Sequence, residues 1–146
     1  MMSTARGRCA RLRATSKSGG DKIKLKLIDS ALGADLLHAL RSMGHGGELV
    51  ICDTNFPADS VARSTTLGRL LHMENVTCPQ AVKAIRSLYP LDTFVDHPAM
   101  RMQVVGKPKE ILPIMTEVQA EIDAAEGKGR SPMVSVERHA FVGPDA

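Results

Sequence analysis

Apolar residues between positions 28 and 43 recur at steps of three and four, the spacing of one helix face. This face is formed by Leu32, Leu36, Leu37, Leu40 and Met43. Gly44 follows directly, and glycine often ends a helix because it tolerates positive φ. The pattern predicts an amphipathic helix that ends just before Gly44.

The segment from Glu48 to Cys52 is short, apolar and β-branched in its middle. A continuous apolar run of this length is typical of a parallel strand covered on both faces, so Cys52 is expected to be buried and inert. The turn-rich sequence "DTNFPADS" at 53–60 then predicts a loop at the carboxyl end of that strand. A second strand is expected at 69–73.

Helical and strand patterns alternate along the rest of the chain. Thr77 precedes Cys78-Pro79 and a helical stripe that Pro90 ends, which predicts a capped helix. Further elements are predicted as strands at 100–105 and 133–136, and as a helix at 108–126 that Pro113 kinks or restarts. Such alternation predicts an α/β fold.

Charge divides the 146 residues into two parts. Residues 1–26 hold eight Lys and Arg against Asp21 alone, a net charge of +7, whereas the remainder holds eleven basic and fifteen acidic residues, a net of −4. We therefore expect a basic, disordered extension at 1–26 and a single domain at 27–146. A mitochondrial transit peptide and a nucleic-acid arm are the alternatives for the extension.

Composition disfavours several functional classes. Aromatic residues make up 3% of the chain, which leaves little for stacking on bases, so a nucleic-acid partner is not expected. No apolar stretch approaches the roughly 20 residues of a membrane helix. The three cysteines form no CxxC pair and suit a reducing cytoplasm better than a disulfide or zinc framework. We expect a cytoplasmic protein without a metal site.

Polar groups bracket the first predicted strand. His45 lies between two glycines before it, and Asp53 and Asn55 follow it. Ligands of open α/β sheets bind at the carboxyl ends of strands, which favours Asp53 and Asn55. An extended strand would place His45 roughly 20–25 Å from Asp53. Spacing alone therefore leaves open whether these residues share a site or only form two turns.

Three stretches carry a resemblance: "LLHALRSMGHGGELVICDTNFPADSVA", "YPLDTFVDHPAMRMQVVG" and "VERHAF". Together they resemble the sugar mutarotase family of L-fucose mutarotase and D-ribose pyranase from about Ile28 to Phe141. The resemblance implies a three-layer α/β fold with a mainly parallel central sheet. It also implies a monosaccharide substrate, no cofactor, and a ring-shaped homo-oligomer with sites between neighbouring subunits.

The resemblance also assigns roles to residues. It implies that His45 is the acid/base residue, that Asp53 and Arg138 bind the sugar, and that Asn55 supports them. An arginine at position 138 resembles the fucose branch more than the ribose branch. Histidine suits the chemistry because its unperturbed pKa near 6.5 lets it take and give a proton at neutral pH.

The carboxyl end departs from the family pattern, because family members continue past the arginine stretch with further strands. The resemblance therefore implies a C-terminally truncated member that lacks its last strands and part of its sugar contacts. Three functions stay open: a fucose-type mutarotase impaired by the short end, an inactive sugar-binding or scaffold relic, and a D-ribose pyranase.

Overall fold

The computed structural model describes residues 25–142, so nearly all of the extension predicted at 1–26 lies outside the described residues. The described chain contains α1 (Ala34–Ser42), α2 (Ala58–Arg63), α3 (Cys78–Arg86), β1 (Met100–Met102), α4 (Pro113–Glu126), β2 (Val134–Val136) and α5 (Arg138–Val142). Strands β1 and β2 pair in parallel, with Met100 opposite Val134 and Met102 opposite Val136. The helices and the parallel pairing confirm the predicted α/β fold.

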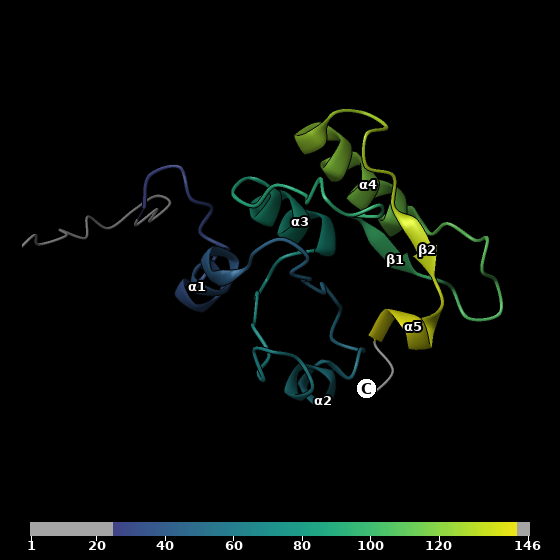
Figure 1. Cartoon of the computed structure of the whole chain (residues 1–146), viewed down its shortest axis with the longest axis horizontal. Coiled ribbons are helices and arrows are strands. Elements are labelled where there is room, and N and C mark those ends of the chain that lie inside the picture. The colour runs from purple at the N-terminus through teal and green to yellow at the C-terminus, as the bar shows by residue number, and fades with distance from the viewer. Residues whose placement is uncertain (1–24, 143–146) are drawn as a thin grey trace, which may run out of the picture.

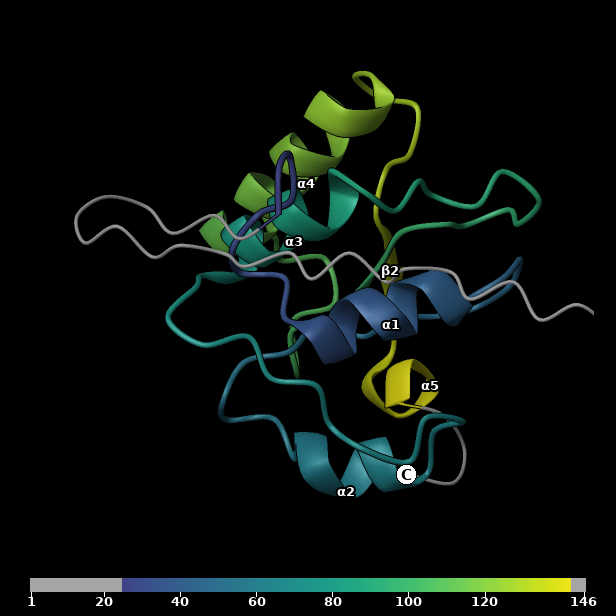
Figure 2. The same ribbon diagram turned by 90° about the vertical axis from the view of Figure 1, so that its left-hand side faces the viewer.

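Helices α3 and α4 pack side by side, and α4 also connects the two strands as their crossover (Figure 1). Parallel strands require a connection of this kind, since a short hairpin can only join antiparallel strands. Helices α1 and α2 lie apart from the strands (Figure 1), and α5 lies close to the end of β2 (Figure 2). The long chain segments that join α1, α2 and α3 therefore cross the middle of the domain.

The predicted cap of the third helix is confirmed. The Thr77 hydroxyl accepts a hydrogen bond from the Gln80 amide at 3.4 Å, and the Gln80 side chain accepts one from the Thr77 amide at 2.7 Å. This reciprocal capping box satisfies two backbone donors that a helix start leaves unpaired. Pro113 begins α4 rather than kinking a longer helix, in keeping with the preference of proline for the first turn.

Two of the predicted strands are wrong. Residues 48–52 and 69–73 are in no strand of the described chain, because no neighbouring backbone forms hydrogen bonds with them. Leu49 and Ile51 are half-buried, whereas Val50 and Cys52 are exposed. The side chains thus alternate as in a strand with one covered face, and the prediction that both faces and Cys52 are buried is also wrong.

Side-chain packing holds these segments in place. The first core cluster joins α1 to α3 through Leu32, Leu36, Leu40, Ala84 and Ile85. Leu49, Ile51, Leu71 and Met73 pack against this cluster. Ile51 also contacts the second cluster, which is formed by Val82, Ala99 and Ile122. Among residues 25–142, no helix is long and apolar enough to cross a membrane.

Candidate active site

His45 lies in a turn that directly follows α1. The Gly47 amide donates to the Gly44 carbonyl at 3.0 Å and closes the turn. Gly46 has a φ of 73°, a left-handed conformation that glycine adopts without steric cost. The glycines around His45 therefore let the chain reverse sharply and present the imidazole on the surface, where 77% of the side chain is exposed.

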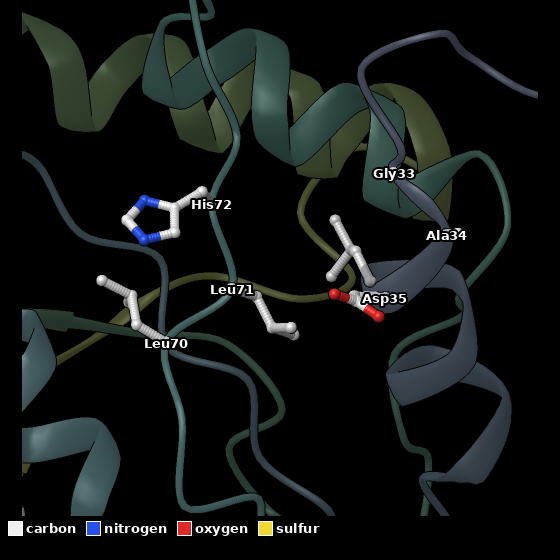
Figure 3. Close-up of a pocket in the computed structure, with 7 residues that line it drawn as sticks. Gly33, Ala34, Asp35, Leu70, Leu71 and His72 are labelled. Atoms are coloured by element: carbon white, nitrogen blue, oxygen red, sulfur yellow. The ribbon is translucent and has the colours of Figure 1, made fainter.

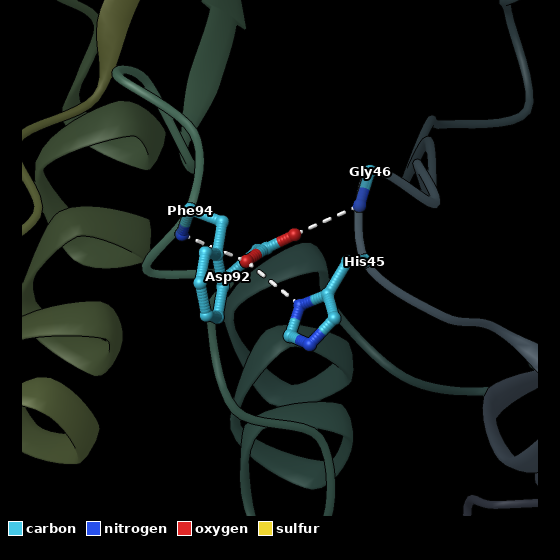
Figure 4. A network of polar contacts seen from close by, with 4 residues as sticks. All are labelled: His45, Gly46, Asp92 and Phe94. Carbon is cyan, nitrogen blue, oxygen red and sulfur yellow. Dashed lines mark hydrogen bonds and ion pairs between the residues drawn. The ribbon is translucent and has the colours of Figure 1, made fainter.

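The Asp92 carboxylate, from the loop between α3 and β1, holds this turn (Figure 4). One carboxylate oxygen, Oδ1, lies 3.2 Å from His45 Nδ1 and accepts a hydrogen bond from the Phe94 amide at 2.9 Å. The other, Oδ2, accepts a hydrogen bond from the Gly46 amide at 2.8 Å. A single side chain thus joins two segments that are 46 or 47 positions apart in sequence.

The surroundings of Asp92 favour its charged form. Hydrogen bonds from the Phe94 and Gly46 amides, with a smaller contribution from His45, hold the pKa of the Asp92 carboxyl below its usual value. The Phe94 ring meets the imidazole in a T-shaped contact with ring centroids 4.5 Å apart. No described residue bonds His45 Nε2. The arrangement therefore presents an imidazole nitrogen to a ligand while a carboxylate contacts the other nitrogen.

Asp53 and Asn55 form their own turn before α2. The Asp53 side chain accepts a hydrogen bond from the Asn55 amide at 2.9 Å, and the Phe56 amide donates to the Asp53 carbonyl at 3.3 Å. This is an Asx turn, which aspartate often forms after an extended segment. Both side chains are exposed, so they stay available to a ligand as well.

Arg138 is the first residue of α5, and its side chain is exposed. Glu137 orders this helix start by accepting a hydrogen bond from the His139 amide at 2.8 Å. Within residues 25–142, no hydrogen bond or ion pair joins His45 to Asp53, Asn55 or Arg138. The structure brings His45 together with Asp92 and Phe94 instead.

Sequence reasoning missed both of these partners. Asp92 and Phe94 lie inside the stretch "YPLDTFVDHPAMRMQVVG", but neither residue was assigned a role there. The local signal is weak, since Asp-x-Phe predicts only an Asx turn. That turn is present, but its carboxylate also reaches the distant His45 turn, which local spacing cannot reveal.

A separate surface hollow of about 330 Å³ lies between the start of α1 and the segment 70–72 (Figure 3). Its lining includes Asp35, Leu71 and His72, and none of the four site residues predicted from the sequence lines it. In the part of the chain that the structure describes, no group of three or more His, Cys, Asp or Glu side chains is arranged to hold a metal ion.

Known proteins show similarity over most of the chain. Human fucose mutarotase is 37% identical over 101 residues, which cover 67% of this chain and 64% of the human protein. L-fucose mutarotase from Glaesserella parasuis serovar 5 (strain SH0165) is 33% identical over 118 residues, 80% of this chain and 76% of that protein. The matched region thus spans slightly less than two thirds of the human relative.

Two crystal structures share the fold. Protein Atu2016, provisionally described as a sugar-binding protein, is 58% identical and superposes with a TM-score of 0.76 over 81% of this chain and 78% of that one. FucU from Bifidobacterium longum is 35% identical, with a TM-score of 0.71 over 80% of each chain. Residues 26–144 also match the sequence model of one protein family. This match, together with the relatives above, shows that the chain belongs to the RbsD / FucU transport protein family.

Proposed function

We propose that this chain is a monosaccharide mutarotase that interconverts the anomers of L-fucose or a closely related sugar. The observation that carries the proposal is the exposed imidazole of His45, which has one nitrogen against Asp92 and the other without a bonding partner among residues 25–142. It occurs in a chain similar to proteins named fucose mutarotase. A side chain that can take and give a proton near neutral pH can accelerate anomer exchange.

In the proposed mechanism, His45 Nε2 takes the proton from the anomeric hydroxyl. The bond between the anomeric carbon and the ring oxygen breaks, a carbonyl forms at the anomeric carbon, and the ring oxygen receives the proton. Rotation about the adjacent carbon–carbon bond and the reverse steps then give the other anomer. Positioned acid–base catalysis of this kind is typically worth roughly 10²–10⁴-fold in rate.

The proposal gives Asp53, Asn55 and Arg138 the task of binding the sugar. Carboxylate oxygens accept hydrogen bonds from hydroxyl groups, and a guanidinium donates several in a fixed geometry. All three side chains are exposed, which supports this role. Self-association into a ring-shaped oligomer is part of the proposal, since a neighbouring copy can supply contacts that one copy does not bring to His45.

Saturation-transfer NMR on the anomeric protons tests the proposal. We expect the chain to accelerate the exchange of L-fucose anomers and His45→Ala to abolish the acceleration. His72→Ala, which removes another exposed histidine outside the predicted site, should keep it. A parallel series with D-ribose decides between the fucose and ribose preferences. Equal exchange rates with and without the protein contradict the proposal.

A second candidate is sugar binding without catalysis. Two observations favour it. Among the described residues, no hydrogen bond or ion pair joins His45 to Asp53 or Arg138. The chain is also similar to a protein provisionally described as sugar-binding. Ligand-detected NMR distinguishes the two. A binder without activity shows L-fucose signals that broaden with protein, while the anomer exchange stays at its uncatalysed rate.

A further inference from the structure

Asp92 contacts His45, the turn that holds His45, and the Phe94 amide. Its side chain is only 19% exposed, although His45 beside it is 77% exposed. Both carboxylate oxygens are used: Oδ1 faces His45 Nδ1 and the Phe94 amide, and Oδ2 faces the Gly46 amide. The backbone contacts fix the carboxylate in place, and the fixed carboxylate in turn contacts the imidazole.

We propose that Asp92 is the positioning residue of His45, which keeps the proton of the neutral imidazole on Nδ1 and leaves Nε2 free to act on the sugar. This inference rests on the proposed function for its kinetic consequence. Its structural content, the tautomer and orientation of the ring, is independent of that function.

The tautomer follows from the chemistry of the two groups. An ionised carboxylate has acceptor sites and no donor, so only the protonated nitrogen of a neutral imidazole forms a favourable contact with it. The hydrogen bonds from the Phe94 and Gly46 amides keep Asp92 ionised at neutral pH. The nitrogen at 3.2 Å from the carboxylate is therefore the one that carries the proton, and Nε2 holds the lone pair.

Phe94 adds a steric constraint on the same ring. Its side chain meets the imidazole edge-on at 4.5 Å, and the Phe94 amide belongs to the same Asx turn as Asp92. Rotation of the imidazole away from Asp92 loses this contact as well as the polar one. A base held in one orientation reacts faster than a freely rotating one, because less conformational freedom is lost on reaching the reactive geometry.

The first test does not depend on activity. Nitrogen-15 correlation spectra of the imidazole report which ring nitrogen is protonated, and His45→Gln assigns the signals. We expect the neutral ring of the wild-type protein to be predominantly protonated on Nδ1. In Asp92→Ala and Asp92→Asn, we expect both tautomers, because alanine offers no acceptor and one amide oxygen cannot serve all three donors.

The second test is kinetic. Asp92→Asn and Asp92→Ala should lower kcat for anomer exchange by at least about tenfold, the order of loss seen when the partner that orients a metal-bound histidine is removed. KM should change little, because both Asp92 oxygens are already engaged by His45, Gly46 and Phe94. Asp35→Asn is the matched control, since it removes a carboxylate that also joins distant segments, through Arg69 at 3.1 Å.

The outcomes separate the two proposals. A wild-type ring protonated mainly on Nε2 overturns the positioning role, whether or not the variants fold. Unchanged tautomers and unchanged kcat in folded Asp92→Ala overturn it too. If the wild-type protein does not accelerate exchange but its tautomer shifts in Asp92→Ala, the proposed function fails while the positioning of His45 stands.

Discussion

At the scale of single residues, Arg86 carries a charge into the interface between α3 and α4. Its side chain is 7% exposed, and its partner Glu126, the last residue of α4, is 23% exposed. The guanidinium also donates to the Tyr89 carbonyl, while its Nε has no hydrogen-bond partner in the described part of the chain. Burial lowers the pKa of Arg86, but arginine stays protonated at physiological pH. The buried positive charge of Arg86 is therefore neutralised mainly by the Glu126 carboxylate.

Glu126→Gln should destabilise the domain. The substitution leaves a buried guanidinium without its carboxylate, and breaking such a pair from one side typically costs about 3–5 kcal/mol. We expect a loss of about 3 kcal/mol in the free energy of unfolding, at the low end of that range, because water reaches part of Glu126. Urea denaturation measures the free energy of unfolding. Glu117→Gln, an exposed carboxylate on the same helix, should change it little, and equal effects of both substitutions would contradict the dependence of Arg86 on Glu126.

The residues of the site differ in how far the sequence could predict them. The turns at His45 and Asp53 were predictable, because flanking glycines and an Asp-x-Asn pattern are local signals that the structure confirms. The contact between His45 and Asp92 was not, because it joins positions 47 apart. Whether Asp53 and Arg138 bind a sugar stays a prediction.

At the scale of elements, Asp92 clips the α3–β1 loop to the turn after α1, and this clip should depend on pH. The amide hydrogen bonds lower the pKa of Asp92 in the folded state below the unfolded value of about 3.9. Such a group stabilises the fold fully above about pH 4, and the contribution is lost as pH falls through the lower folded pKa. Acid should therefore weaken the hydrogen bonds by which Asp92 joins the α3–β1 loop to the turn after α1.

Amide exchange across an acid pH series measures this loss. After correction for the intrinsic pH dependence, we expect the protection of the Gly46 and Phe94 amides to fall together below about pH 4. Asp92→Asn should remove this pH dependence. Asp96→Asn is the control, because Asp96 lies in the same loop without a hydrogen bond to another described residue. A wild-type profile in Asp92→Asn would show that Asp92 does not hold the clip.

The elements themselves were predictable where their signals are local. The capped helix α3 and the proline start of α4 follow from side chains within a few positions of each helix end. The segments 48–52 and 69–73 were mispredicted as strands because a strand exists only when another backbone pairs with it. Apolar alternation shows which side chains face the core, but it does not supply that partner.

At the scale of the whole molecule, the described surface exposes several large hydrophobic side chains. Large hydrophobic side chains at least 43% exposed include Val50, Leu67, Phe94, Met100, Val105 and Ile111. Val50 lies on the uncovered face of residues 48–52, whose backbone groups lack ladder partners among residues 25–142. An extended apolar segment with unpaired backbone is the kind of surface that pairs with another chain. In the proposed oligomer, a second copy of this chain would cover this segment.

Val50→Asp should therefore weaken self-association. Placing a charge where the valine side chain would be buried loses at least about 1.5 kcal/mol of apolar transfer energy per copy, which corresponds to roughly a tenfold weaker dissociation constant. Size-exclusion chromatography with light scattering over a dilution series measures the mass. Val105→Asp, at a side chain 73% exposed in the β1–α4 loop, is the matched control. A monomeric wild-type protein, or dissociation by Val105→Asp alone, would place this apolar segment outside any interface between copies.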